Sequence, residues 1–343
     1  MSTLDPILLP SENRFTLFPI KYWKVYEYAK QHQASEWKAE EIEYHLDLKD
    51  WNNVLTNDER HFIKMTLAFF ASSDGIVAEN LNTNFSEEVQ IPEARYFYSV
   101  QNKMEWVHAE TYSNFIDTYF DNEIEKNQVF NAMREFPSIS KMNRWAIKWM
   151  SRNQPFHVRI YAFSIVEGLF FSGPFCSIFW LKKRGLLPNL CISNEWISRD
   201  EALHTEFAAL LYRLLKNKID NVLMIEIMEE AMTILKEFVS EALPVRLIGM
   251  NADAMFQYLK YVADNLLEWF ESDRYYKVSN PFQWMVNIGL DVKANFFEKT
   301  VTSYQASDVM DNFYKRKLLA ETPVENNTTE KTVPTWDLDN TSF

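Results

Sequence analysis

The sequence predicts an all-α protein, and three observations lead to that fold class. Only 6 of the 343 residues are glycine, whereas tight β-turns depend on residues that adopt positive φ. Apolar residues recur at helical spacing along most of the chain, which indicates amphipathic helices. The chain also contains 26 Phe, 16 Tyr and 11 Trp residues, whose side chains can fill a wide, dry interior.

The predicted helices follow one another from the N-terminal end. Residues 1–20 contain three prolines and predict an extended arm before the first helix. Thr56 and Glu59 form a capping box, so a long helix should begin there and run past Asp74. The other helices are expected at 21–34, 93–119, 124–135, 138–153, 156–183, 194–216, 220–240, 252–270 and, in part, 281–303. Together they predict one helical domain over residues 21–310.

The C-terminal segment, residues 311–343, differs in composition from this domain. It is polar, contains two prolines and lacks helical periodicity. Such a segment buries too little apolar surface to offset the entropy of folding, which predicts a disordered tail.

Charge and cysteine content exclude several classes of protein. The formal net charge is −13 and no long run of Lys and Arg occurs, which argues against nucleic-acid binding. Cys176 and Cys191 form no CxxC or zinc pattern, as is typical of a reducing compartment. The N-terminus lacks a basic region followed by an apolar stretch. We therefore expect no signal peptide and a cytoplasmic location.

One segment has the length and composition of a membrane helix. The 21 residues from Tyr161 to Leu181 carry a single charged side chain, that of Glu167. A lone carboxylate is costly inside a bilayer, and no other segment resembles a membrane span. We therefore expect a central helix of a large soluble bundle and no membrane association.

Two Glu-x-x-His motifs provide candidate metal ligands. Glu105 precedes His108, and Glu201 precedes His204. Residues three apart share a helix face, so each motif can offer a carboxylate and an imidazole to one ion. A single motif of this kind is weak evidence, but two of them on long apolar helices are much less common.

Two further acids, Asp74 and Glu167, complete a set of six ligands. Both lie in strongly apolar sequence, where an unpaired carboxylate is costly, although a structural role for Asp74 is an equal alternative. The order of acids and Glu-x-x-His motifs is that of ferritin-like di-iron proteins, with one Asp in place of a Glu. Four carboxylates balance two divalent ions, and oxygen and nitrogen ligands suit iron or manganese. The sequence therefore predicts a ferritin-like bundle with a di-metal site in its core.

Tyr112 is a candidate for oxidation by such a centre. It follows Glu105 by seven residues, which places it within about 20° of Glu105 around the helix, facing the metals. A purely structural core tyrosine is the alternative. Phe171 and Phe175 follow Glu167 by four and eight residues, and this apolar setting suits a small reactant such as O2 better than a phosphate.

Five longer motifs surround these residues: SDGIVAENL, VQIPEARYFY, MEWVHAETYS, VEGLFFSGPFCSIFWLKKRGL and NEWISRDEALH. With them the chain resembles, from about Arg14 to Tyr304, the small, radical-generating subunit of class I ribonucleotide reductase of the eukaryotic or viral type. The resemblance implies a homodimer in which a di-iron centre and O2 form a stable radical on Tyr112. It also implies that the radical passes to a large subunit, which reduces ribonucleotides to deoxyribonucleotides.

The resemblance further implies a role for each matching residue. Two iron ions per chain would be held by six ligands, with Asp74, Glu105 and His108 at one ion and Glu167, Glu201 and His204 at the other. An apolar pocket would protect the Tyr112 radical, and its members would be Phe171, Phe175 and Ile197. Trp37 would deliver an electron through Asp200 to His108, and Tyr304 would relay the radical toward the tail.

The tail would bind the large subunit. Its end, WDLDNTSF, offers apolar anchors at Trp336, Leu338 and Phe343 among acidic residues, although the last residues differ from the family's usual ending. Two other functions suit a two-metal bundle. An oxidase acting on a lipid-like ligand would need an open apolar pocket but neither Tyr304 nor the tail, and iron storage would predict a shorter, shell-forming bundle.

Overall fold

The structure is a computed structural model that describes residues 5–10, 12–244, 246–247, 249–282, 285, 310, 313, 314 and 317. The predicted relay tyrosine and the predicted tail anchors lie outside these residues, namely Tyr304, Trp336, Leu338 and Phe343. The same is true of most of the helix expected at 281–303 and of the first four residues of the arm.

Helices dominate the described part of the chain, which contains no β-strand. The α-helices are α1 (Trp23–Ala34), α2 (Leu48–Asn53), α3 (Asn57–Asn80), α4 (Ser86–Glu88), α5 (Pro92–Tyr119), α6 (Glu123–Phe130), α7 (Ala132–Glu135), α8 (Pro137–Met150), α9 (Phe156–Ile165), α10 (Ser172–Lys183), α11 (Pro188–Leu214), α12 (Asn221–Ala242) and α13 (Ala252–Trp269). Short 3-10 helices are η1 (Pro6–Leu8), η2 (Glu12–Phe15), η3 (Ala39–Glu41) and η4 (Tyr44–Asp47). Two π-helical turns are η5 (Leu81–Phe85) and η6 (Val166–Phe170). The predicted all-α class is confirmed.

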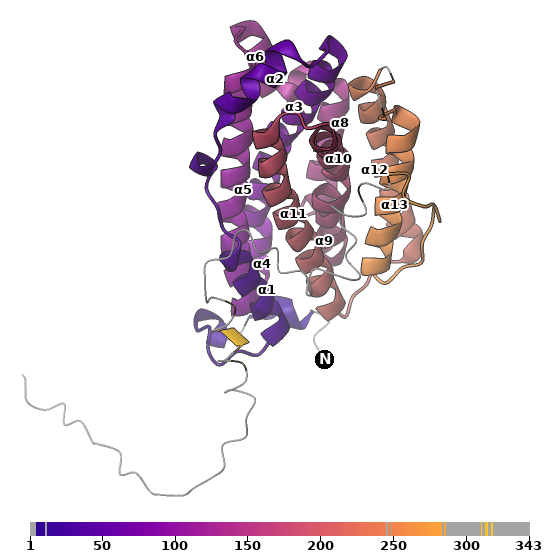
Figure 1. The fold of residues 1–343 in the computed structure, drawn as a ribbon. Coiled ribbons are helices and arrows are strands. Elements are labelled where there is room, and N and C mark those ends of the chain that lie inside the picture. Colours follow the sequence, from indigo (N-terminus) through magenta and orange to yellow (C-terminus); the bar gives the residue numbers. More distant parts are fainter. Residues whose placement is uncertain are drawn as a thin grey trace, which may run out of the picture.

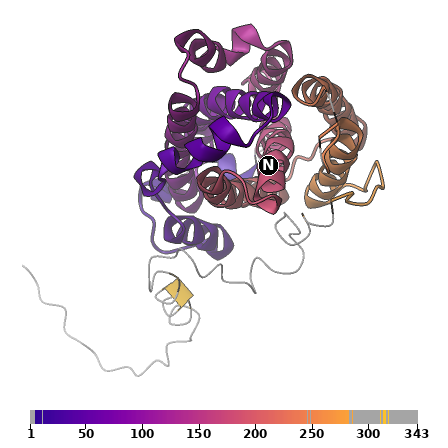
Figure 2. The same ribbon diagram turned by 45° about the horizontal axis from the view of Figure 1, so that its top comes forward.

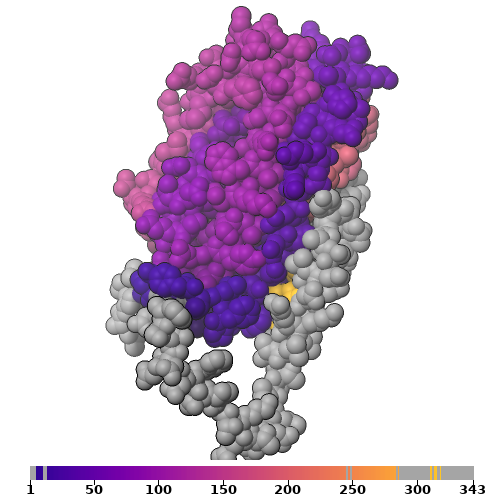
Figure 3. Space-filling view, turned by 90° about the vertical axis from the view of Figure 1, so that its left-hand side faces the viewer, coloured from indigo at the N-terminus to yellow at the C-terminus, as the bar shows by residue number. Residues whose placement is uncertain are grey.

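The long helices form one elongated bundle (Figure 1). Helix α5 packs against α1 and α3, and α11 packs against α9, α10, α5 and α1. Helices α12 and α13 pack against each other at one side of the bundle, where they contact α8 and α10 (Figure 2). The opposite side, shown in Figure 3, is formed chiefly by the first half of the chain.

Several helix ends follow the signals in the sequence. The Thr56 hydroxyl accepts a hydrogen bond from the Glu59 N–H at 3.2 Å, and the Glu59 carboxylate accepts one from the Thr56 N–H at 2.8 Å. This is the predicted capping box at the start of α3. Helix α5 begins at Pro92, and α10 ends shortly before Gly185, whose φ of +70° suits glycine.

Three predicted helices have different limits in the structure. The run expected at 156–183 is divided into α9, η6 and α10 because the π turn interrupts its hydrogen-bond pattern. The helix expected at 124–135 is split at Asn131, whose φ of −99° and ψ of 34° are not helical. Helix α11 begins at Pro188, six residues before the predicted start at 194, because proline is favoured in the first turn.

The apolar segment is the centre of the bundle. The helical run Phe156–Lys183 is long and apolar enough to cross a membrane, with a mean hydropathy of 1.5 over its most apolar window. All of that window is buried inside the fold. The prediction of a central bundle helix is confirmed, and the burial accounts for its composition without a bilayer.

The N-terminal arm lies against this bundle. Ile7 is fully buried, and its carbonyl accepts a hydrogen bond from the Gln90 N–H at 2.8 Å. The Asp5 carboxylate accepts hydrogen bonds from the backbone N–H groups of Lys216 and Asn217 at 2.6 and 3.1 Å. The arm thus links the end of α11 to the start of α5.

Candidate metal centre

Four helical segments bring the six predicted ligands into the core. The ligands are Asp74 on α3, Glu105 and His108 on α5, Glu167 in η6, and Glu201 and His204 on α11. Each has an exposed fraction of 1% or less. Helix α3 packs on α5, and α11 packs on both α5 and η6, so the four segments face one another.

A glycine allows the π turn to approach α11. A Cβ atom on Gly168 would lie 2.8 Å from Cγ2 of Thr205, which is closer than carbon atoms approach in proteins. Glycine therefore permits contact between the η6 backbone and α11 beside Glu167. Single π turns inside helices occur frequently at functional sites.

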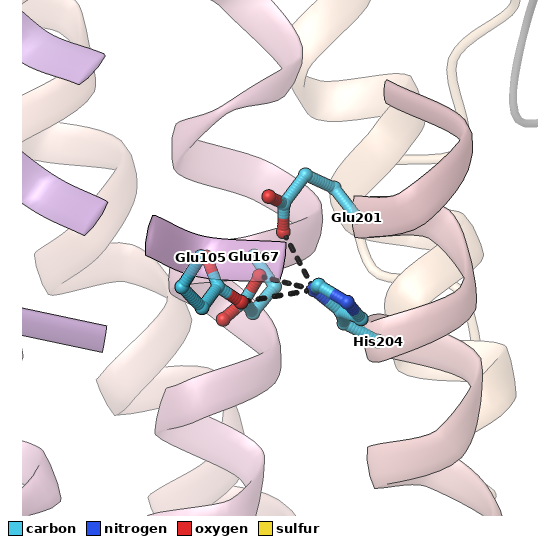
Figure 4. Close-up of side chains that lie close together, drawn as sticks. All are labelled: Glu105, Glu167, Glu201 and His204. Atoms are coloured by element: carbon cyan, nitrogen blue, oxygen red, sulfur yellow. Dashed lines mark hydrogen bonds and ion pairs between the residues drawn. The ribbon is translucent and has the colours of Figure 1, made fainter. Parts of the chain in front are cut away.

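His204 lies at the centre of one group of ligands (Figure 4). Its Nδ1 atom is 3.1 Å from a carboxylate oxygen of Glu105, 3.1 Å from one of Glu201 and 3.5 Å from one of Glu167. One potential ligand atom from each of these four residues lies within 4.8 Å of the others. This group is compact enough for one ion to contact all of its members.

His108 is part of a second, overlapping group. Its Nδ1 atom is 3.0 Å from Oε1 of Glu201 and 3.7 Å from Oε2 of Glu105. Glu105 and Glu201 therefore lie between the two imidazoles and offer oxygen atoms to both sides. Asp74 is close enough to Glu105 and His108 for their charges to shift its pKa.

The donor atoms of this cluster fit metal ions. Several have no hydrogen-bond partner among the described residues: both carboxylate oxygens of Asp74 and of Glu167, Oε2 of Glu105, Oε1 of Glu201 and Nδ1 of His108. Buried polar atoms without partners are costly, and buried carboxylates are more so. Cations would satisfy all of these atoms at once, and two ions would balance the four carboxylates.

Burial and neighbouring charges shift the pKa values of the carboxyl groups. Burial, and then the charge of Glu105, raise the pKa of Asp74 well above its usual value. Burial and the charges of Glu201 and Glu105 raise the pKa of Glu167 in the same way. Burial also opposes the charge on Glu201, but the nearby His204 brings the pKa of Glu201 below its usual range.

The neighbouring carboxylates raise the pKa of both imidazoles. Burial opposes their charged forms, but the hydrogen bond to Asp200 and the nearby carboxylates of Glu105 and Glu201 raise the pKa of His108 well above its usual value. The charges of Glu201 and Glu105 do the same to the pKa of His204. Before ions bind, the raised pKa values therefore favour the protonated forms of four groups in the cluster, namely Asp74, Glu167, His108 and His204. Four protons carry the same total charge as two divalent ions.

A polar chain connects His108 to Trp37. The Trp37 Nε1–H donates a hydrogen bond to Oδ2 of Asp200 at 2.8 Å, and the same oxygen lies 3.2 Å from Nε2 of His108. Arg199 donates to the other oxygen of Asp200 at 3.0 and 3.2 Å. The indole ring stacks on the His108 ring with centroids 5.8 Å apart. The predicted order Trp37–Asp200–His108 is thus continuous in the structure.

Tyr112 lies in an apolar pocket beside the cluster. Its side chain is 1% exposed, and its hydroxyl has no hydrogen-bond partner among the described residues. Its ring stacks on Phe70, with centroids 4.3 Å apart and planes 5° apart. Phe70 in turn contacts Phe171 and Phe175 at centroid distances of 5.6 and 5.1 Å. Ile197 is buried in the same core.

Two residues of this region were not identified from the sequence. Phe70 lies one helical turn before Asp74, so helical spacing from that ligand could have identified it. His32 lies on α1, and its Nε2 atom is 2.8 Å from Nε2 of His204. No spacing in the sequence connects His32 to His204, because only the packing of α1 on α11 brings them together.

Known proteins with similar sequences have the same family description. The family model of the ribonucleotide reductase small chain matches residues 14–281. The sequence is 51% identical over 310 residues to one of the ribonucleoside-diphosphate reductase small chains of Arabidopsis thaliana, covering 90% of this chain and 93% of that one. It is 50% identical over 318 residues to small chain 1 of Saccharomyces cerevisiae, covering 92% and 80%.

Solved structures share the fold as well. The ribonucleotide reductase Rnr4 homodimer of Saccharomyces cerevisiae aligns with a TM-score of 0.74 at 34% identity, over 81% of this chain and 88% of that one. The ribonucleotide reductase R2 subunit of Clostridium botulinum, at 23% identity, aligns with a TM-score of 0.68 over 78% and 88%. The resemblance inferred from the motifs is confirmed, and the chain belongs to the ribonucleotide reductase small-chain family.

Proposed function

We propose that this chain uses two iron ions and O2 to form a stable radical on Tyr112. As a member of the small-chain family, the chain is the radical-generating subunit of a ribonucleoside-diphosphate reductase. The observation that carries the proposal is the set of six buried ligands, many with unpartnered donor atoms, beside a tyrosine without a hydrogen-bond partner. A cation-binding cluster and an oxidisable ring share one dry interior.

Two ferrous ions would supply electrons for the reduction of O2, and manganese is the other metal that suits these oxygen and nitrogen ligands. Glu105 and Glu201 would bind both ions, because each lies near both imidazoles. Asp74 and His108 would complete one coordination shell. Glu167 and His204, the remaining two ligands, would complete the other.

The surroundings of Tyr112 suit a long-lived radical. Oxidation of a tyrosine removes an electron and the phenolic proton. After burial, the charge of Asp74 has the largest effect on the pKa of Tyr112, and Asp74 is therefore our candidate to receive that proton. Phe70, Phe171 and Phe175 offer no polar group and exclude water, which slows reduction of the ring by solutes.

The proposal also includes a route for electrons and a partner. Trp37, through Asp200 and His108, would supply an electron during O2 activation. Tyr304 would relay oxidising power to a large subunit, and the tail would bind that subunit through Trp336, Leu338 and Phe343. We also propose a cytoplasmic homodimer, since a related yeast chain is described as a homodimer.

Electron paramagnetic resonance provides the test. Adding ferrous iron and then O2 to the metal-free protein should give a tyrosyl radical signal. Tyr112→Phe keeps the ring stacked on Phe70 but removes the oxidisable hydroxyl, so it should bind two ions, consume O2 and give no lasting signal. A wild-type signal from Tyr112→Phe would place the radical on another residue.

The alternative of a lipid oxidase is less well supported. The relatives that match nearly the whole chain are described as reductase small chains. A lipid-like substrate would also need a route to the metals, whereas the six ligands and Tyr112 are each at most 1% exposed. The reductase function therefore remains our conclusion.

A further inference from the structure

We propose that His32 is a positioning residue for the metal ligand His204. It accepts a hydrogen bond from the Nε2–H of His204 and so holds the Nδ1 atom of His204 toward the metal. The inference rests on the proposed metal centre but not on radical chemistry at Tyr112.

The direction of this hydrogen bond follows from the proton count of imidazole. A neutral imidazole carries one proton on one of its two nitrogen atoms. The Nδ1 atom of His204 faces Glu105, Glu167 and Glu201, so it is the nitrogen that would bind an ion. The proton must then reside on Nε2, which lies 2.8 Å from Nε2 of His32. His32 therefore has to accept with that atom.

The surrounding structure fixes the ring of His32 in this position. His32 is fully buried in the last turn of α1, a helix that packs on both α5 and α11. Its carbonyl accepts hydrogen bonds from the N–H and the hydroxyl of Ser35 at 3.1 and 3.0 Å. The Phe97 ring contacts both imidazoles, at centroid distances of 5.3 Å from His32 and 6.3 Å from His204.

The other nitrogen of His32 also points to a function. Its Nδ1 atom is buried and has no hydrogen-bond partner among the described residues. A buried polar atom without a partner lowers the stability of the fold, so an apolar residue would stabilise this part of the core more. The bond to His204 gives a reason for an imidazole at this position.

A neutral partner also preserves the charge balance of the cluster. Asp200 already places one carboxylate behind His108, where Arg199 compensates its charge. A second carboxylate behind His204 would add a negative charge to a dry cluster that two divalent ions balance. An imidazole can orient His204 without adding charge.

Anaerobic titration with Co²⁺ tests the proposal, because the visible spectrum of this ion reports its ligands. His32→Leu keeps an apolar side chain in the space but removes the acceptor. It should weaken one of two Co²⁺ sites by roughly 10- to 100-fold, the usual effect of losing such an outer hydrogen bond. His32→Gln, whose Oε1 can occupy the place of Nε2, should restore binding and the spectrum. His32→Asn, which is too short to reach His204, should not.

His61→Leu is the matched control. His61 is a partly buried histidine near the start of α3, and its Nε2 lies 3.0 Å from the carbonyl oxygen of Glu241. It should bind both Co²⁺ ions like the wild type. If His32→Leu does not fold, as judged by its melting transition without metal, the comparison of His32→Gln with His32→Asn still tests the proposal.

Two outcomes would overturn different claims. Equal Co²⁺ affinity and spectra for the wild type, His32→Leu and His32→Asn would remove the role of His32 and leave the metal centre intact. Failure of the wild-type chain to bind Co²⁺ would overturn the metal centre itself, and the role of His32 with it.

Discussion

The two imidazoles of the metal centre have opposite surroundings behind their Nε2 atoms. His108 faces the carboxylate of Asp200, which also binds Arg199 and Trp37. His204 faces the imidazole of His32, whose second nitrogen has no partner among the described residues. Both ligands belong to Glu-x-x-His motifs on long helices, so the motifs alone make them appear equivalent.

The difference shows where charge can enter and leave the centre. A chain of hydrogen bonds leads from His108 to Trp37, and Trp37 contacts the partly exposed ring of Trp196 at 5.3 Å. No such chain leads from His204 within the described residues, because Phe97 covers the rings of both His204 and His32. One half of the centre is connected to other redox-active side chains, and the other half is insulated.

The largest expected effect is the pH dependence of metal binding, which should be the same in kind for both halves of the centre. The pKa values of Asp74 and His108 on one side, and of Glu167 and His204 on the other, are raised, which favours their protonated forms in the metal-free chain. Two ions must displace up to four protons, so binding weakens as the pH falls below those pKa values. The combined binding constant should then fall by up to roughly ten-thousandfold per pH unit. Calorimetry in buffers of different ionisation enthalpy counts these protons, and release of none would contradict the protonation described above.

Glu167→Ala should weaken binding of the ion in the half of the centre that contains His204. The variant removes a ligand from one ion only, so the chain should bind one ion tightly and the other at least about 100-fold more weakly. Metal analysis after gel filtration measures this. Glu206→Gln is the control, because Glu206 is a buried glutamate of α11 that accepts a hydrogen bond from Tyr28 and should not affect either ion. Two ions retained by Glu167→Ala would exclude Glu167 as a ligand.

Asp200→Asn should weaken the half that contains His108. An amide keeps the shape and one acceptor oxygen but loses the charge that favours the proton on Nε2 of His108. Loss of such a carboxylate typically lowers metal affinity by about 10- to 100-fold. Stepwise titration with Mn²⁺ should show one weakened ion and one unchanged ion. An equal loss at both ions would show that the two halves do not differ as described.

Trp37→Phe should have the smallest effect on metal affinity. It removes one hydrogen bond to Asp200, which Arg199 and His108 still contact. A net hydrogen bond contributes about 0.5–1.5 kcal/mol, which corresponds to at most roughly tenfold in affinity. The radical yield should fall further than the affinity if Trp37 supplies an electron. A fall in affinity as large as that of Asp200→Asn would instead make Trp37 chiefly a structural support.

Much of the fold could be predicted because its signals are local. The capping box at Thr56 and Glu59 and the proline at position 92 act within a single helical turn, so they mark the starts of α3 and α5 without tertiary information. The π turn at η6 could not be predicted, because an apolar run has the same appearance with or without one extra residue. The start of α11 at Pro188 precedes the predicted one because the helical pattern is recognisable only from 194 onward.

The candidate site also has a part that local spacing predicts and a part that only tertiary packing brings together. Glu105 with His108, and Glu201 with His204, share helix faces, so spacing alone groups each pair. Spacing cannot identify His32, because its contact with His204 joins residues 172 positions apart in the chain. The family resemblance supplied the match of Trp37 to Asp200, which lie 163 positions apart.

The π turn at η6 has a consequence for insertions and deletions. A π turn contains one residue more than a regular α-helical turn. Deleting one residue within Val166–Phe170 would let the backbone close as continuous α-helix, so the loss need not unfold α9 or α10. Either kind of turn advances the helix by about one full rotation, so α9 and α10 would keep their angular relation across the deletion. The turn itself, which carries Glu167 and brings Gly168 close to Thr205, would be rebuilt with one residue fewer. A frame-preserving loss of a single codon here would therefore displace the metal ligand while the helices on both sides stay in register.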